Sequence, residues 1–202
     1  MNRRVSLTPI SMSLRPLFTM ALIGALASCA GSISDEDAIV CLCVRTSWID
    51  RGLRAIVFED GTVFARVGTG APAPDTGAYL FRLDKRRRSR IIETLYRNDF
   101  LGLPPRLELL ATDGTSEEFL FANSDTVHHV YRYMAPNRKL DAIRTAFVTT
   151  LEADLIRANA VPREEWLAAL SQRLDAVPEG SSKRTAISSW LDCSTPYWHV
   201  PR

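Results

Sequence analysis

Two Asp-Gly pairs, Asp60-Gly61 and Asp113-Gly114, each separate two short runs that are rich in β-branched and aromatic residues. Asp-Gly is favoured in two-residue hairpin turns, because both positions need a positive φ that these residues tolerate. Strands joined by so short a turn must be antiparallel, since parallel strands need a long crossover connection. The pairs therefore predict one hairpin from residues 53–59 and 62–67 and another from residues 106–111 and 116–122, and they exclude an all-parallel sheet.

Periodicity predicts the remaining elements. Further strands are expected at residues 38–45, 78–83 and 126–133. Asp84 has the side chain of a helix N-cap, so a helix is expected from there to about residue 98. A second helix is expected at residues 136–158, with Pro136 near its start, and a third at residues 161–177.

This order of elements predicts an α+β domain at residues 38–160. Its antiparallel sheet has about seven strands in two runs, and its two main helices pack on one face. Residues 161–202 are expected to add a C-terminal helix, a linker at residues 178–184 and an aromatic tail from residue 185, packed on the domain.

The amino-terminal segment, residues 1–28, has the organisation of an export signal. Arg3, Arg4 and Arg15 form a basic flank, and residues 17–27 form an apolar run that is too short to cross a bilayer. Translation starts at Met1 or Met12, and the second start would leave Arg15 as the only basic residue of the signal.

Residues 26–29, Leu-Ala-Ser-Cys, lie at the end of this run and resemble a bacterial lipobox. The resemblance implies that Cys29 receives a diacylglyceryl group and, after cleavage before it, a further acyl chain such as palmitate. Residues 29–37 are then a lipidated tether, and Ala30 favours sorting to the outer membrane, with the domain facing the periplasm. The alternative is a cut before Ser28, which would release a soluble periplasmic or secreted protein.

The domain itself also carries a resemblance. Asp60-Gly61-Thr62-Val63, the Gly-rich residues 68–77, and Phe100, Leu101 and Leu103 at the end of a helix resemble the pattern of uncharacterised bacterial lipoprotein domains. This resemblance supports the α+β fold and implies no activity.

Composition and motifs narrow the function. Without its signal the chain has 22 basic and 23 acidic residues, which argues against a nucleic-acid partner. The sequence has no Gly-x-Ser-x-Gly elbow, Walker loop, dinucleotide fingerprint or His-Glu-x-x-His motif. We therefore expect no catalytic residues, cofactor or metal, and a protein that acts by binding or assembly contacts. The alternatives are a small-ligand or enzyme-inhibitor module that uses the loop at residues 68–77 and, third, an envelope hydrolase.

Lipidation of Cys29 leaves three cysteines, Cys41, Cys43 and Cys193. Cys41 and Cys43 lie two apart in a predicted strand, too far apart for an unstrained disulfide. The predicted bridge joins one of them to Cys193. The rival hypothesis, a metal site that adds His199, is less favoured because Cys-x-Cys is unlike the usual zinc spacing.

Five cations occupy the first turns of the first predicted helix, where the helix dipole disfavours positive charge. We interpret them as a contact surface for anionic lipid, lipopolysaccharide phosphates or an envelope protein, and the alternative is a solvated helix face. The five are Lys85, Arg86, Arg87, Arg88 and Arg90. His128 and His129 are adjacent in a predicted strand, so they should point to opposite faces and not share a site.

Overall fold

Ile39, Val40, Cys41, Leu42 and Cys43 are consecutive and all buried, which is typical of a strand covered on both faces. They begin β1 (Ile39–Thr46), a central strand of the computed structural model, which describes residues 35–46, 52–68, 77–111 and 114–193. Within these residues the sheet has eight strands in the order β5-β7-β6-β1-β2-β3-β4-β8, all antiparallel except the β5–β7 pair. The α+β class is therefore confirmed, with one strand more than expected.

The hairpin at Asp60-Gly61 forms as predicted. It joins β2 (Leu53–Val57) to β3 (Thr62–Val67), with Val57 opposite Val63. Asp60 accepts a hydrogen bond from the Thr62 amide at 3.0 Å. Gly61 has a φ of +86°, and a Cβ there would lie 2.3 Å from the Leu83 carbonyl oxygen, so the turn requires glycine. β4 (Gly77–Arg82) pairs with the other edge of β3.

The predicted hairpin between residues 106–111 and 116–122 is wrong. β5 (Arg106–Glu108) is shorter than expected and pairs in parallel with β7 (Val127–Tyr133). β6 (Thr115–Ala122) lies instead between β1 and β7. Six consecutive residues of β6 are buried, so this strand gains more by pairing in the centre of the sheet than at its edge.

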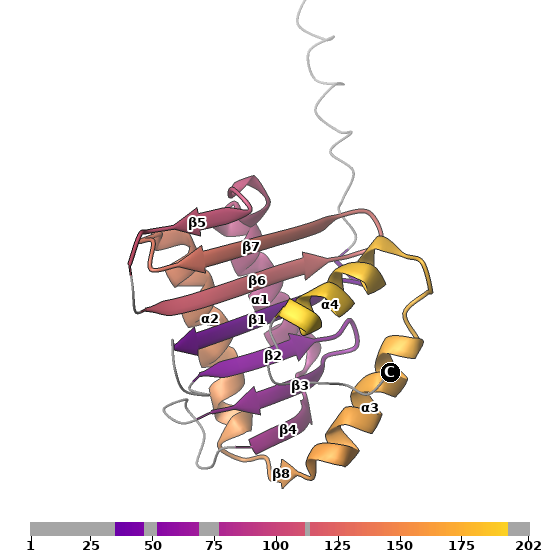
Figure 1. Cartoon of the computed structure of the whole chain (residues 1–202). Coiled ribbons are helices and arrows are strands. Elements are labelled where there is room, and N and C mark those ends of the chain that lie inside the picture. The colour runs from indigo at the N-terminus through magenta and orange to yellow at the C-terminus, as the bar shows by residue number, and fades with distance from the viewer. Residues whose placement is uncertain (1–34, 47–51, 69–76, 112–113, 194–202) are drawn as a thin grey trace, which may run out of the picture. The chain divides into compact units, whose positions relative to one another are not determined.

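Two helices cover one face of the sheet (Figure 1). α1 (Lys85–Arg97) begins after Asp84, whose side chain accepts from the Arg87 amide at 2.8 Å, as the N-cap prediction required. α2 (Arg138–Leu155) begins two residues after Pro136, because Asn137 caps it by accepting from the Leu140 amide at 3.0 Å. A short helix η1 (Phe100–Gly102) follows α1.

The C-terminal region covers the opposite face, so the helices do not all pack on one side (Figure 1). β8 (Ala160–Val161) pairs with β4, and α3 (Arg163–Asp175) follows it. The last three residues of the predicted linker and the start of the predicted tail instead form α4 (Ser182–Cys193). Ile187 and Trp190 of α4 are buried in the same core cluster as Cys41.

Candidate functional site

The chain enters the domain through a docked segment, residues 35–38, which we call the strap. Arg88, only 7 % exposed, donates from Nη2 to the carbonyl oxygens of Asp35 at 2.7 Å and Ala38 at 2.8 Å. The Tyr96 hydroxyl donates to Asp35 Oδ1 at 2.6 Å. Burial and this carboxylate raise the pKa of Tyr96, which keeps the hydroxyl protonated as a donor. Residues 35–37, predicted as tether, are thus held on α1.

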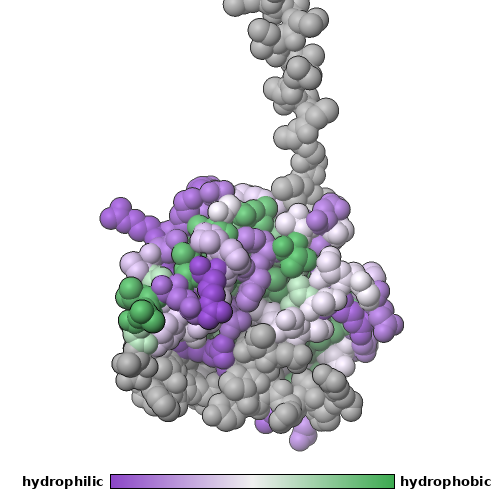
Figure 2. Space-filling model, turned by 45° about the horizontal axis from the view of Figure 1, so that its top comes forward, coloured by the Kyte–Doolittle hydropathy of each residue, from purple (hydrophilic) through white to green (hydrophobic). Residues whose placement is uncertain are grey.

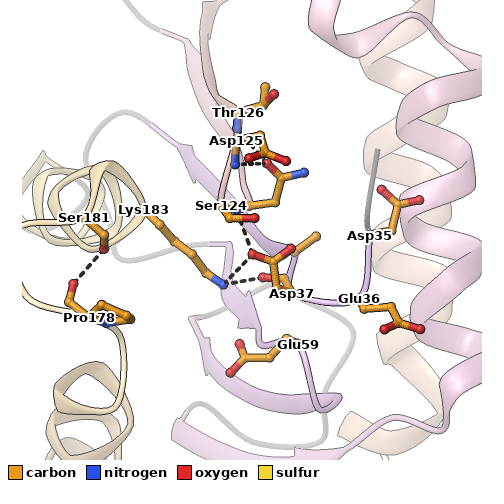
Figure 3. Close-up of polar contacts among 12 residues, drawn as sticks. Asp35, Glu36, Asp37, Glu59, Ser124, Asp125, Thr126, Pro178, Ser181 and Lys183 are labelled. Carbon is orange, nitrogen blue, oxygen red and sulfur yellow. Dashed lines mark hydrogen bonds and ion pairs between the residues drawn. The ribbon is translucent and has the colours of Figure 1, made fainter. Parts of the chain in front are cut away.

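A second set of contacts holds the strap from the other side. The Ser124 amide donates to Asp37 Oδ2 at 2.7 Å, and Lys183 Nζ lies 3.7 Å from the same carboxylate oxygen. Lys183 also donates to the backbone carbonyl of Asp37. Figure 3 shows Lys183 reaching from α4 toward Asp37, with Ser124 beside them. The strap therefore bridges α1, the β6–β7 turn and α4.

The five cations predicted to bind anionic partners separate into two groups. Arg87 pairs with Asp154 and donates to the Thr150 carbonyl of α2, and Arg88 holds the strap. These two side chains are structural. Lys85, Arg86 and Arg90 are exposed, and we call them the exposed cation group.

A cavity of about 550 Å³ lies where α1 begins, beside the Asp60-Gly61 turn. Its charged lining mixes both signs, because Arg82, Lys85 and Arg88 stand among Glu36, Glu59, Asp60 and Asp84. Burial lowers the pKa of Arg88, and the acidic groups around it, Glu59 first, oppose that shift. The Nε atom of Arg88 is buried without a hydrogen-bond partner. Among the described residues no group of His, Cys, Asp or Glu has the arrangement of a metal site.

Cys41 and Cys43 are buried free thiols on the face covered by α3 and α4. Burial raises the pKa of Cys43 to about 11, and Arg54 and Arg45 only partly offset this. Such a thiol is protonated at neutral pH and is a poor nucleophile. Cys193 ends α4, but its side chain, like Cys29 and His199, lies outside the described residues. The predicted bridge to Cys193 therefore stays a prediction.

The two histidines point to opposite faces, as predicted. His128 packs edge-on against Phe100 on the α1 side, with ring centroids 5.0 Å apart. His129 Nε2 lies 3.5 Å from Glu118 Oε2 on the α4 side. Burial alone would raise the pKa of Glu118, but His129 and the ion-paired Arg45 hold it below its ordinary value. Sequence reasoning missed this buried carboxylate.

Comparison with known proteins adds no identification, because neither a protein-family model nor a curated protein matches the chain. No helix in the described part of the chain is long and apolar enough to cross a membrane.

Proposed function

We propose that this protein is a lipid-anchored component of a bacterial cell envelope that acts by binding or assembly contacts at the membrane surface. The observation that carries the proposal is the lipobox-like Leu-Ala-Ser-Cys at residues 26–29 after a basic flank and a short apolar run. Two or more acyl chains on Cys29 would give stable anchoring, where one chain gives only marginal binding.

The strap supports a close approach of the domain to the lipid. Asp35 is the sixth residue after Cys29, and six residues span at most about 22 Å when fully extended. Arg88 and Tyr96 hold Asp35 on the domain, so the proposed tether reaches the domain at Asp35, before residue 37. The docked end of the strap thus stays within about 22 Å of the lipidated residue.

The exposed cation group lies on α1, the helix on which the strap is held. Lys85, Arg86 and Arg90 lie within five residues of Arg88, so a helical rise of about 1.5 Å per residue keeps them close to the strap. A Lys or Arg near an anionic surface contributes about 1 kcal/mol to membrane attraction. We therefore propose anionic headgroups as the surface that these three side chains contact.

The anchor is tested by intact-mass and detergent-partition analysis of the expressed protein beside Cys29→Ser. We expect the wild-type chain to carry diacylglyceryl and acyl mass and to enter the detergent phase. The Cys29→Ser chain should do neither. A wild-type chain that begins at Ser28 and carries no acyl group would overturn the proposed anchoring and leave a soluble exported protein.

The lipid contact is tested on the full chain bearing Cys29→Ser, so that the anchor makes no contribution. Lys85→Glu/Arg86→Glu/Arg90→Glu should weaken binding to anionic vesicles about 100-fold, from about 1 kcal/mol for each contact. The matched control reverses three exposed cations away from the start of α1, Arg97, Arg138 and Arg163. Equal loss in both variants would show attraction by net charge and contradict a defined surface.

A further inference from the structure

β5 ends the sheet, and no described strand pairs with its outer edge. Its inner edge faces β7, since the Pro105 carbonyl accepts from the Tyr131 amide at 2.9 Å and the Leu109 amide donates to the Tyr133 carbonyl at 3.0 Å. Backbone groups of successive strand residues point to alternate edges. The amides and carbonyls of Arg106 and Glu108 therefore face outward, where they can pair with another strand.

The residues on this edge are complementary to themselves. β5 reads Arg106-Leu107-Glu108. Within one chain, Arg106 Nη2 pairs with Glu108 Oε1 at 2.6 Å. If two copies meet antiparallel with Leu107 opposite Leu107, each Arg106 also stands opposite a Glu108 of the other copy. We propose that β5 pairs in this register with β5 of a second copy of the chain, about a two-fold axis at Leu107. The two sheets then become continuous across the dimer.

The hydrogen-bond pattern fits this register. Arg106 and Glu108 of opposite copies form the hydrogen-bonded pairs, which gives four backbone hydrogen bonds. If the chain stays extended on both sides of β5, the Leu110 amide would meet the carbonyl of Pro104 in the second copy and add one bond at each end. Proline is tolerated there because only its carbonyl is needed.

Side chains next to this edge are apolar and exposed. Leu110 is fully exposed, and Leu109 and Met134 are about half exposed. Met134 also has a φ of +54°, a conformation that costs an L-residue other than Gly or Asn about 1–2 kcal/mol. Figure 2, in which the top of the Figure 1 view comes forward, shows hydrophobic and hydrophilic residues interleaved on this side of the molecule. Antiparallel pairing would bring Leu110 of one copy against Pro104 of the other.

Sheet edges are normally protected by short strands and by charges that repel a second copy. β5 is short, but its two charges balance each other within the strand, so an antiparallel copy meets opposite charges and is not repelled. A three-residue pairing buries less than the about 1,000 Å² of a stable interface. We therefore expect weak association in solution and stronger association when a membrane anchor concentrates the chains.

Charge reversal tests the pairing without touching the core. Glu108→Arg places a cation opposite Arg106 of the other copy at both ends of the pairing, and we expect the dimer dissociation constant to rise at least tenfold. Arg106→Glu/Glu108→Arg restores opposite charges across the axis and should recover the wild-type value. Sedimentation of the full chain with Cys29→Ser measures both, and cross-linking of the wild-type chain in vesicles repeats the comparison.

A cysteine scan tests the register. Leu107→Cys, with Cys29 and Cys193 changed to Ser, places two thiols opposite each other at about 4.5 Å between Cα atoms, within disulfide range. Arg106→Cys in the same background faces Glu108 and should not cross-link. A monomer at all concentrations in solution and in vesicles would overturn the inference, as would a dimer that ignores both charge variants or an Arg106→Cys cross-link as efficient as that of Leu107→Cys. Because the solution arm needs no lipid, failure of the anchor proposal leaves this test intact.

Discussion

On one face of the sheet α1 and α2 pack against a large aliphatic and aromatic core, whereas on the other face α3 and α4 cover a smaller core with two thiols and two tryptophans. The first layer comes from helices that directly follow strands. The second comes from chain that follows the whole sheet. β1 is buried on both faces, so the layer formed by α3 and α4 is needed to cover its second face. The C-terminal layer is therefore an integral part of the fold.

Two neighbouring carboxylates of β6 show the same difference between the two faces of the sheet. Glu117 and Glu118 are adjacent on β6 and both buried, and they point to opposite faces. Glu117 pairs with Arg132, which also binds Asp141 at 2.8 Å, and with Arg144 at 2.7 Å. Glu118 pairs with Arg45 and lies near His129. On the first face, the buried carboxylate is therefore neutralised within a network of ion pairs that includes side chains of α2. On the second face, the buried carboxylate has a smaller set of charged neighbours, which come from the sheet itself.

The largest expected effect on stability tests whether both helical layers are integral parts of the folded domain. Phe147→Ala on α2 and Trp166→Ala on α3 each remove a buried aromatic side chain, which costs about 3–5 kcal/mol of unfolding free energy. Trp166 additionally donates from Nε1 to the Tyr79 carbonyl at 3.1 Å. Urea unfolding of the two variants should give similar losses in a single transition. A loss below about 1 kcal/mol for Trp166→Ala alone would show that the C-terminal layer is an appendage.

A smaller difference should separate the two carboxylates. Arg132→Met leaves Glu117 buried with one partner fewer, and we expect a loss of about 3 kcal/mol. Arg45 is a quarter exposed, so Arg45→Met lets water approach Glu118 and should cost about 1 kcal/mol. Urea unfolding at pH 7 measures both. Equal costs would contradict the contrast drawn between the two faces.

Local patterns in the sequence predicted the first layer well. The Asp60-Gly61 turn, the Asp84 cap and the spacing of Ile91, Ile92 and Leu95 are all short-range signals, and the structure confirms each. The pairing of β5 with β7 and that of β6 with β1 were missed, because strand order depends on which strand gains most from the centre of the sheet, and no local pattern encodes that.

The sequence does contain patterns that could have predicted the buried position of Arg88 and the helix α4. Arg88 lies at helical spacing before Ile91, Ile92 and Leu95, which places it on the buried stripe of α1 rather than among the exposed cations. Ile187 and Trp190 repeat at helical spacing after Ser181, whose Oγ accepts from the Arg184 amide at 3.2 Å as a cap. The hydrogen bonds from Arg88 to the strap carbonyls, by contrast, follow from tertiary packing alone.

A further effect concerns the thiols of the second face and appears only at alkaline pH. Burial raises the pKa of Cys43 to about 11 in the folded chain, whereas an exposed thiol in the unfolded chain ionises near pH 8.5. Between these values the unfolded chain has released the proton that the folded chain retains. The unfolding free energy should therefore be unaffected below about pH 8.5 and fall as pH rises toward 11.

Cys43→Ala removes this contribution, whereas Cys41, whose pKa is raised by burial and by Cys43, and the remaining groups are present in both chains. With a reductant present, urea unfolding at about pH 8, 9.5 and 10.5, which spans the window between the two pKa values, should show a shallower decline for Cys43→Ala than for the parent. Thr145→Ala, at an α2 residue on the other layer, serves as the control and should keep the parent slope. Identical slopes for Cys43→Ala and the parent would show that the thiol ionises alike in both states. The α4 layer would then not shield Cys43 from water as its burial implies.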